Sequence, residues 1–341
     1  MTEQYQSATF DPASLAAYPG GPRLLADIGG TNARFALESS PGRIDFIEVL
    51  PCAKYATLAH ALRAYLALPA VVDASSSGIR HGAIAIANPV IGDMVRMTNH
   101  HWEFSIEALR TEIGFDVLVV ANDFTALARA LPHLGEKKRQ VGGGSSIPGT
   151  PLGLLGAGTG LGVSGMVPSG DSWTALLSEG GHVTFSPANE VEVAILQFAW
   201  RQFEHVSAER FLSGAGIELL YRALAHIKGA PDLGLDAAEI SRRGLGGECP
   251  LCDQAIDVFC GMLGTVAGNL AITLGAQGGV YIGGGIVPRL GERFDASCFR
   301  KRFEQKGRFV SYLAQVPTYV ITAEYPAFIG VSAILADKLA H

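Results

Sequence analysis

The sequence contains one short pattern twice, a strand followed by a turn of glycine and threonine and then by a second strand. The first copy, residues 23–37, reads RLLADIGGTNARFAL, and the second, residues 152–167, reads LGLLGAGTGLGVSGMV. Apolar residues flank both turns, as is typical of buried strands. Because a repeat constrains architecture more than any single motif, this pattern predicts an internal duplication with α/β structure in both halves.

Apolar periodicity predicts the other elements. Further strands are expected over 82–87, 117–120 and 279–282. Helices are expected over 57–68, 105–113 with Ser105 as the cap, 124–131, 191–204, 216–227, 254–275 and 328–339. The first twenty-odd residues, with two prolines and a Gly-Gly before Arg23, predict a loosely held tail.

Composition indicates a globular protein large enough for two lobes. The chain has 341 residues, of which 48% are hydrophobic and only 17% charged. Its net charge of -6 and its single dense basic run, Lys137-Lys138-Arg139, argue against a nucleic-acid partner. We predict that no apolar segment is long enough to span a membrane, and the N-terminal residues lack secretory character.

The five cysteines do not suggest a disulfide framework, so reduced thiols in a cytoplasmic protein are expected. Cys249 and Cys252 form a C-x-x-C, followed by Cys260. A structural zinc site usually needs four ligands, and no second pair with suitable spacing follows. Packing of small apolar side chains near a helix start is therefore favoured over metal binding.

Three glycine-rich turns, residues 27–32, 156–162 and 283–285, are candidates for phosphate binding. In such turns successive backbone N–H groups converge on an anion, and glycine has no Cβ to block its approach. None of the three fits a Walker A loop or G-x-G-x-x-G, which argues against P-loop enzymes and Rossmann dehydrogenases. Each turn alone is better explained as a plain hairpin, but three together favour a nucleotide held between two lobes. Asp27 would repel a phosphate unless Mg²⁺ intervened, which indicates a metal–nucleotide complex.

Asn122 and Asp123 directly follow the apolar run 117–120, which predicts a buried strand. In an open α/β sheet, ligands bind beyond the carboxyl ends of such strands, so the Asp123 carboxylate is expected at a cleft. From this stretch alone, capping of the next helix by Asp123 is the more common role.

Three further polar residues, Glu179, His182 and Glu209, occur in the segments LSEGGHV and VSAERFLSG. Two glycines separate Glu179 from His182, so this is not a helical metal motif. His182 alone is most simply a structural histidine, and Glu209 is most simply an acid in the first turn of a helix, although its spacing from Ser207 is wrong for a capping box. Together with Asn122 and Asp123 they form donors and acceptors suited to a polyhydroxylated ligand.

Seven motifs, in order along the chain, resemble those of bacterial glucokinases, members of the actin/sugar kinase ATPase superfamily. The motifs are LADIGGTNARFAL, MTNHHWEFS, ANDFTALA, GAGTGLGV, EGGHVTF, HVSAERFLSG and GGVYIGGGIVPR. The resemblance runs from about residue 23 to the C-terminus. It implies an α/β, two-lobed actin-like ATPase (ribonuclease H-like) fold with a ligand cleft between a small α/β lobe and a larger α+β lobe. The expected domains are 23–133 with 325–341 and 134–324, preceded by a flexible tail at 1–22.

The resemblance also implies an activity, transfer of the γ-phosphate of ATP to the 6-hydroxyl of glucose, with ATP and Mg²⁺ as cofactors. Asp123 is implied as the general base. The implied sugar contacts are Asn122, Asp123, Glu179, His182 and Glu209. The implied ATP contacts are Asp27, Gly29, Gly30, Thr31, Asn32, Gly156, Gly158, Thr159, Gly160, Gly214, Gly283, Gly284 and Gly285. No dedicated metal site is expected apart from Mg²⁺ bound with ATP near Asp27, and a homodimer is implied by the resemblance alone.

Two other functions stay open. The nearer is a kinase for another hexose or a broad hexokinase. The other is a sugar-sensing regulator that has lost catalysis, which would be expected to lack the base, whereas Asp123 is present.

Overall fold

The computed structural model describes residues 8–9, 21–170 and 172–340. The chain divides into two compact units, Met1–Gly135 with Ala323–His341 (unit 1) and Glu136–Thr322 (unit 2). Most of the predicted tail at 1–22 lies outside the described residues, although Ala8–Thr9 form a short strand, β1, paired with residues 43–44.

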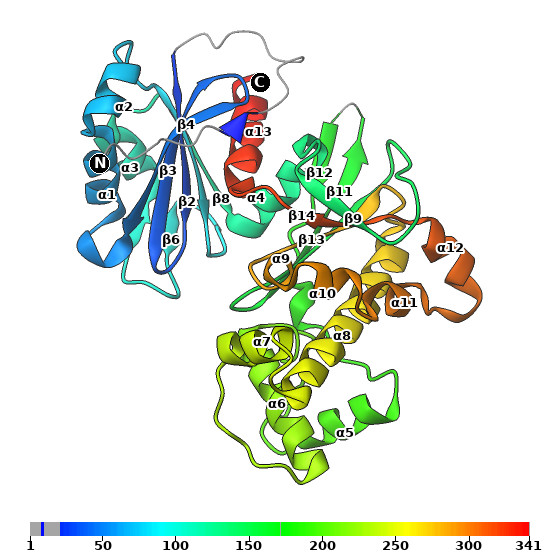
Figure 1. Ribbon diagram of the computed structural model, residues 1–341. Coiled ribbons are helices and arrows are strands. Elements are labelled where there is room, and N and C mark those ends of the chain that lie inside the picture. Colours follow the sequence, from blue (N-terminus) through cyan, green and yellow to red (C-terminus); the bar gives the residue numbers. More distant parts are fainter. Residues whose placement is uncertain (1–7, 10–20, 171, 341) are drawn as a thin grey trace. The chain divides into compact units, whose positions relative to one another are not determined.

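Unit 1 contains a six-stranded sheet with the order β1-β4-β3-β2-β5-β8 (Figure 1). The other strands of this sheet are β2 (Arg23–Ile28), β3 (Asn32–Ser40), β4 (Arg43–Pro51), β5 (His81–Ile86) and β8 (Val117–Asn122). A separate two-stranded sheet consists of β6 (Met94–Arg96) and β7 (Glu103–Ser105). The helices of unit 1 are η1 (Cys52–Lys54), α1 (Leu58–Leu66), α2 (Pro69–Ala74), α3 (Ile106–Ile113), α4 (Asp123–Ala130), η2 (Leu131–His133) and α13 (Pro326–Ala340).

Helices cover both faces of this sheet. Alternate residues of β2, Leu24, Ala26 and Ile28, share a core with Leu62 and Tyr65 of α1, as the period of two in a strand requires. On the other face α13 contacts β2, β5 and α4 (Figure 1).

Unit 2 contains a second six-stranded sheet, with the order β12-β11-β10-β13-β14-β9. Its strands are β9 (Lys138–Val141), β10 (Leu152–Ala157), β11 (Leu161–Ser169), β12 (Ser172–Ala175), β13 (Gly279–Gly283) and β14 (Thr318–Ile321). Its helices are η3 (Gly180–His182), α5 (Glu190–Ala199), α6 (Gly214–Lys228), α7 (Ala237–Leu245), α8 (Pro250–Leu274), α9 (Val287–Leu290), α10 (Glu292–Asp295), α11 (Phe299–Glu304), η4 (Gly307–Phe309) and α12 (Val310–Gln315).

The two sheets repeat one topology, which confirms the predicted duplication. In unit 1 the antiparallel strands β4, β3 and β2 are followed across the sheet by β5 and β8, both parallel to β2. In unit 2 the strands β12, β11, β10, β13 and β14 have the same order and the same directions. The sheet of each unit therefore contains the hairpin that the sequence repeat encodes.

The long helix α8 forms the centre of unit 2, where it contacts α6, α7, α11 and β10. Glycine allows the closest of these contacts, because a Cβ at Gly264 would overlap the carbonyl oxygen of Phe299 at the start of α11. In the described part of the chain, α8 is the one helix long and apolar enough to cross a membrane, with a mean hydropathy of 1.6. The expectation that no apolar segment reaches that length was therefore wrong. Since 67% of its apolar window is buried inside the protein, the hydrophobicity of α8 is explained by its place in the core.

The strand predicted at 117–120 is present, but it is not a central buried strand. β8 lies at the edge of the sheet, and within it only Leu118 is buried. An apolar run specifies a strand without specifying its place in the sheet order, which depends on the crossover connections.

Candidate active site

Three parallel strands of unit 1 end at the same edge of the sheet. β2 ends just after Asp27, β5 is followed by Asn88, and β8 ends at Asn122. Ile28, Ile86 and Asn122 lie side by side in the ladder, so the three carboxyl ends are level. This is where open α/β sheets place their ligand-binding residues.

Asn122, not Asp123, caps helix α4. The Oδ1 of Asn122 accepts hydrogen bonds from the N–H groups of Phe124 (3.0 Å) and Thr125 (3.1 Å). The capping role considered for Asp123 was therefore assigned one residue too late, since Asp123 is already the first residue of the helix. Its Oδ1 accepts from Phe124 N–H (2.8 Å) and from the amide of Asn122 (3.0 Å), which holds the carboxylate in one orientation.

The surroundings of Asp123 favour a proton acceptor that titrates near neutral pH. Burial and, to a lesser extent, the charge of Asp27 raise the pKa of Asp123 from its ordinary 3.8 to about 6, against the opposing hydrogen bonds from Phe124 and Asn122. Burial also raises the pKa of Asp27, although the guanidinium of Arg34, 3.0 Å away, lowers it. A carboxylate with a pKa of about 6 is suited to accept a proton during a reaction at neutral pH.

The glycine turn of unit 1 closes the hairpin between β2 and β3. Gly29 N–H donates to the carbonyl of Asn32 (3.0 Å), and the turn is held from outside by Cys52. The backbone N–H of Cys52 donates to the carbonyl of Thr31 (2.8 Å), and its thiol donates to that of Gly29 (3.4 Å). The backbone of this turn is thus fixed, and the exposed Thr31 lies at its tip.

Asn88 was missed by the sequence reasoning. It is buried, and its Oδ1 accepts from both the N–H (3.1 Å) and the hydroxyl (2.9 Å) of Thr98. Its backbone carbonyl accepts from the side-chain amide of Asn122 (3.3 Å). Asn88 therefore connects the segment 97–105, one of the resembling motifs, with the strand ends that carry Asp123. An asparagine before a proline predicted only a turn here.

The glycine turn of unit 2 also closes a hairpin, and the carboxylate of Glu209, from another segment, is hydrogen-bonded next to it. Gly156 pairs with Gly162 within the ladder, so the turn proper is Gly158 to Gly160, closed by a hydrogen bond of 2.8 Å between these two residues. Glu209 accepts through Oε2 from the N–H of Leu161 (2.8 Å). A Cβ at Gly160 would overlap this carboxylate, which explains the glycine.

The segments that carry Glu179, His182 and Glu209 pair with each other. Glu209 N–H donates to the carbonyl of Gly181 (2.9 Å), and Ala208 N–H donates to that of Val183 (2.9 Å). The Nδ1 of His182 lies 4.0 Å from Oε1 of Glu209, and the histidine side chain is 60% exposed. Glu179 is exposed at the start of η3, and its carboxylate makes no hydrogen bond or ion pair with the rest of the described chain. The structure therefore brings His182 and Glu209 together and leaves Glu179 beside them.

The other two predicted ATP segments of unit 2 contact the same hairpin. Gly214, the first residue of α6, donates its N–H to the carbonyl of Gly158 (2.9 Å). Gly284 has a φ of +80°, and a Cβ there would overlap the backbone of Ala157. The predicted second turn, the segment around Gly214 and the turn 283–285 thus form one cluster in unit 2.

The family model that matches this chain is described as glucokinase, and it matches residues 24–338. The chain belongs to the glucokinase family. It is 56% identical over 320 residues to a glucokinase of Chromobacterium violaceum, covering 94% of this chain and 90% of that one. It is 60% identical over 323 residues to a bifunctional protein glk of Paraburkholderia xenovorans, covering 94% of this chain but only 50% of the relative. The chain thus spans about half the length of the bifunctional relatives.

A solved structure supports the same assignment. The crystal structure of a glucokinase from an Antarctic psychrotroph is 36% identical, with a TM-score of 0.85 over 93% of this chain and 99% of that one. The predicted family and the predicted actin-like ATPase fold of sugar kinases are confirmed.

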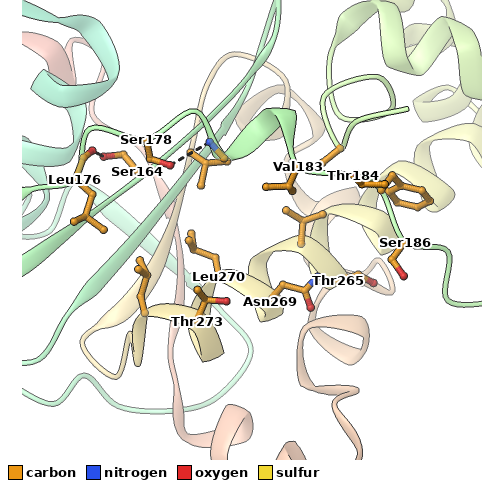
Figure 2. A pocket seen from close by; sticks show the side chains of 16 residues that line it. Ser164, Leu176, Ser178, Val183, Thr184, Ser186, Thr265, Asn269, Leu270 and Thr273 are labelled. Atoms are coloured by element: carbon orange, nitrogen blue, oxygen red, sulfur yellow. Dashed lines mark hydrogen bonds between the residues drawn. The ribbon is translucent and has the colours of Figure 1, made fainter. Parts of the chain in front are cut away.

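Unit 2 also contains a cavity of about 280 Å³, which is not lined by the predicted sugar-binding residues of this unit. It is lined mainly by apolar side chains of β11, α8 and the segment 176–186, with Ser178, Thr184 and Asn269 among its polar residues (Figure 2). Glu179, His182 and Glu209 do not line it, although Gly180 and Ala208, which belong to the same two segments, do. It is not the predicted sugar site.

Asp27 is the residue that fits a metal carried in with a nucleotide. Mg²⁺ is commonly bound by one or two protein carboxylates together with substrate phosphates, so one acid at the end of β2 suffices. Within the described part of the chain no group of three or more His, Cys, Asp or Glu residues is placed to hold a metal by itself.

Proposed function

We propose that this chain is a glucokinase, which transfers the γ-phosphate of ATP to the 6-hydroxyl of D-glucose. The observation that carries the proposal is the carboxylate of Asp123, held by Phe124 and Asn122 at the end of β8 with its pKa raised to about 6. Family membership and the glycine-turn cluster of unit 2 support it.

Asp123 acts as the general base. The oxygen of the sugar's primary hydroxyl attacks the γ-phosphorus while its proton passes to the Asp123 carboxylate. Because phosphoryl transfer depends mostly on positioning and on charge stabilisation, the base needs a fixed orientation more than high basicity. The hydrogen bonds from Phe124 and Asn122 supply that orientation.

Asn122, Glu179, His182 and Glu209 bind the sugar hydroxyls. The carboxylate of Glu209 and the imidazole of His182 are close enough to share a hydroxyl, since 4.0 Å separates their nearest atoms. Polar groups that await hydroxyls are left unpaired by a sugar that lacks them, which is a strong source of selectivity.

The glycine turns bind the nucleotide. Thr159 and Gly160 at the tip of the unit 2 hairpin, with Gly214 and the turn 283–285, are proposed for ATP in that unit, and residues 29–32 are proposed for phosphate in unit 1. Asp27 would hold Mg²⁺ bound with ATP, and this ion would neutralise charge on the phosphates.

A coupled assay of ADP release with and without glucose tests the proposal. We expect ADP release to depend on glucose, and ATP hydrolysis at the same rate without sugar would refute the kinase function. Polyphosphate in place of ATP tests the phosphoryl donor.

The alternative is a kinase for another hexose. Comparison of kcat/KM for glucose, mannose, fructose and N-acetylglucosamine separates the two, and a value for another sugar that equals or exceeds that for glucose would favour the alternative. We further propose a cytoplasmic homodimer. All five cysteines are free thiols, as expected in a reducing compartment, and light scattering of the purified chain tests the dimer.

A further inference from the structure

Cys249 and Cys252 stand at the first turn of α8 and have no part in the proposed function. Cys249 is the N-cap, Pro250 is the first helical residue and Cys252 is the third. The Sγ of Cys249 accepts a hydrogen bond from the backbone N–H of Cys252 at 3.4 Å. The local fold thus holds the sulfur of one cysteine directly against the next cysteine of the motif.

A neutral thiol is an unusual residue for a helix cap. Ser, Thr, Asp and Asn are preferred because their oxygens accept the free N–H groups, whereas a thiol sulfur is a weak acceptor. A thiolate accepts better, and its negative charge is favoured at a helix N-terminus. The position therefore suits Cys249 better when it is ionised.

The two thiols differ in exposure. Cys252 is fully buried, whereas Cys249 is only partly buried. A small oxidant from solution can therefore reach Cys249 first. Cys252 is then the neighbouring thiol that can displace the oxidant from the sulfur of Cys249.

The more exposed thiol, that of Cys249, is also the more acidic of the two. Burial acts to raise the pKa of Cys249, but hydrogen bonds from the Cys252 thiol and from the N–H groups of Cys252 and Leu251, with the charge of Arg243, lower it overall. Burial raises the pKa of Cys252 to about 12. Burial likewise raises the pKa of Cys52, Cys260 and Cys298.

The charged and titratable groups that face this pair come from two neighbouring helices. Arg243 on α7 faces the thiols and is held by Glu239 at 2.6 Å. Tyr221 on α6 faces them from the other helix. The pair thus lies near the guanidinium of Arg243, the carboxylate of Glu239 and the phenol of Tyr221, whose pKa burial raises.

We propose that Cys249 and Cys252 are a reversible dithiol–disulfide couple that reacts with low-molecular-weight disulfides of the glutathione class. The Cys249 thiolate attacks one sulfur of the disulfide, forms a mixed disulfide and releases one thiolate. Cys252 then loses its proton to solvent and attacks the Cys249 sulfur, which releases the second thiolate. Two protein thiols are oxidised to one disulfide, and the small disulfide is reduced to two thiols.

The test equilibrates the purified full chain in buffers with increasing ratios of oxidised to reduced glutathione. After an acid quench, free thiols are alkylated and counted by intact mass and by peptide mapping. We expect the thiols of Cys249 and Cys252 to be lost together while the other three stay alkylated, with full recovery after reduction. Retention of all five thiols in the folded chain, with reaction only in urea, would overturn the proposal.

Three variants assign the steps, with circular dichroism confirming that each is folded. Cys252→Ser should stop at a mixed disulfide on Cys249, and Cys249→Ser should slow the reaction at Cys252 by about 100-fold or more. Cys298→Ser, which removes another partly buried thiol of unit 2, should behave as the unmodified chain. Attack that begins at Cys298, or an unchanged rate in Cys249→Ser, would contradict the assignment.

Discussion

Replacement of Asp123 by asparagine should abolish most of the activity and at the same time stabilise the protein. The substitution keeps the size of the side chain and an Oδ1 that can accept from Phe124 N–H, at 2.8 Å in the present structure. It removes the proton acceptor, so kcat should fall by about 10²- to 10⁴-fold, while the KM for glucose changes far less.

The gain in stability follows from the raised pKa. Since folding moves the pKa of Asp123 from 3.8 to about 6, the folded state binds the proton more tightly than the unfolded state. The carboxylate therefore lowers stability at pH values above about 6, and this cost is lost as the pH falls toward 3.8. At about 1.4 kcal/mol per pKa unit, the ionised form costs about 3 kcal/mol, an upper limit for what asparagine recovers.

Urea unfolding at pH 8 and at pH 5 measures this effect. We expect Asp123→Asn to be more stable by about 1–3 kcal/mol at pH 8 and by about half of that gain at pH 5. The exposed Asp73→Asn on α2 is the control, with a change within about 0.5 kcal/mol at both pH values. A pH-independent gain, or a loss of stability at pH 8, would refute the electrostatic reasoning, and near-normal turnover would remove Asp123 from the role of base.

Three further variants test other parts of the structure. Glu209→Gln should raise the KM for glucose by about tenfold or more in the coupled assay, because a charged acceptor for hydroxyls becomes a neutral amide; a change in the KM for ATP alone would contradict the sugar role. Asn88→Ala should cost about 1–3 kcal/mol in urea unfolding and reduce kcat, since it leaves the N–H and hydroxyl of Thr98 unpaired; unchanged kcat would separate Asn88 from the catalytic edge. Gly330→Ala should destabilise the chain by more than about 2 kcal/mol, because a Cβ there would overlap the carbonyl oxygen of Ala126, and an unchanged urea midpoint would show that α13 can shift.

Local patterns made much of the fold predictable. Alternating apolar residues around a glycine turn identified both hairpins, and Ser105 was correctly expected to cap α3, because strand period and capping depend on neighbours in sequence. The place of β8 at the edge of its sheet was not predictable in this way. It depends on which strands the crossovers bring together, and an apolar run contains no such information.

The candidate site was predictable as a set of residues but not as an arrangement. The bond from Leu161 to Glu209 joins residues 48 positions apart, and the contact of Cys52 with Gly29 spans 23 positions. Such pairs leave no periodic pattern in the sequence. The hydrogen bond of Glu209 to the second turn and the contacts of Cys52 with the first turn were therefore not predicted. Asn122 was predicted only as a sugar ligand. A polar residue between a strand and a helix can cap the helix or bind a ligand, and the sequence alone does not separate these two roles.

The duplicated hairpin is used differently in the two units. In unit 1 its turn is fixed from behind by Cys52, and the carboxylate of Asp27 lies in the strand that leads into it. In unit 2 the carboxylate of Glu209 is already hydrogen-bonded to the turn itself, through the N–H of Leu161. This N–H is consequently not available to a phosphate, so the proposed phosphate contacts of the second turn are left to Thr159 and Gly160. The other carboxylate oxygen of Glu209 lies 4.0 Å from His182, so a sugar bound there, as proposed, would act directly on the backbone of the second glycine turn. A single acid from another segment, Glu209, thereby connects the proposed sugar and nucleotide sites within one unit.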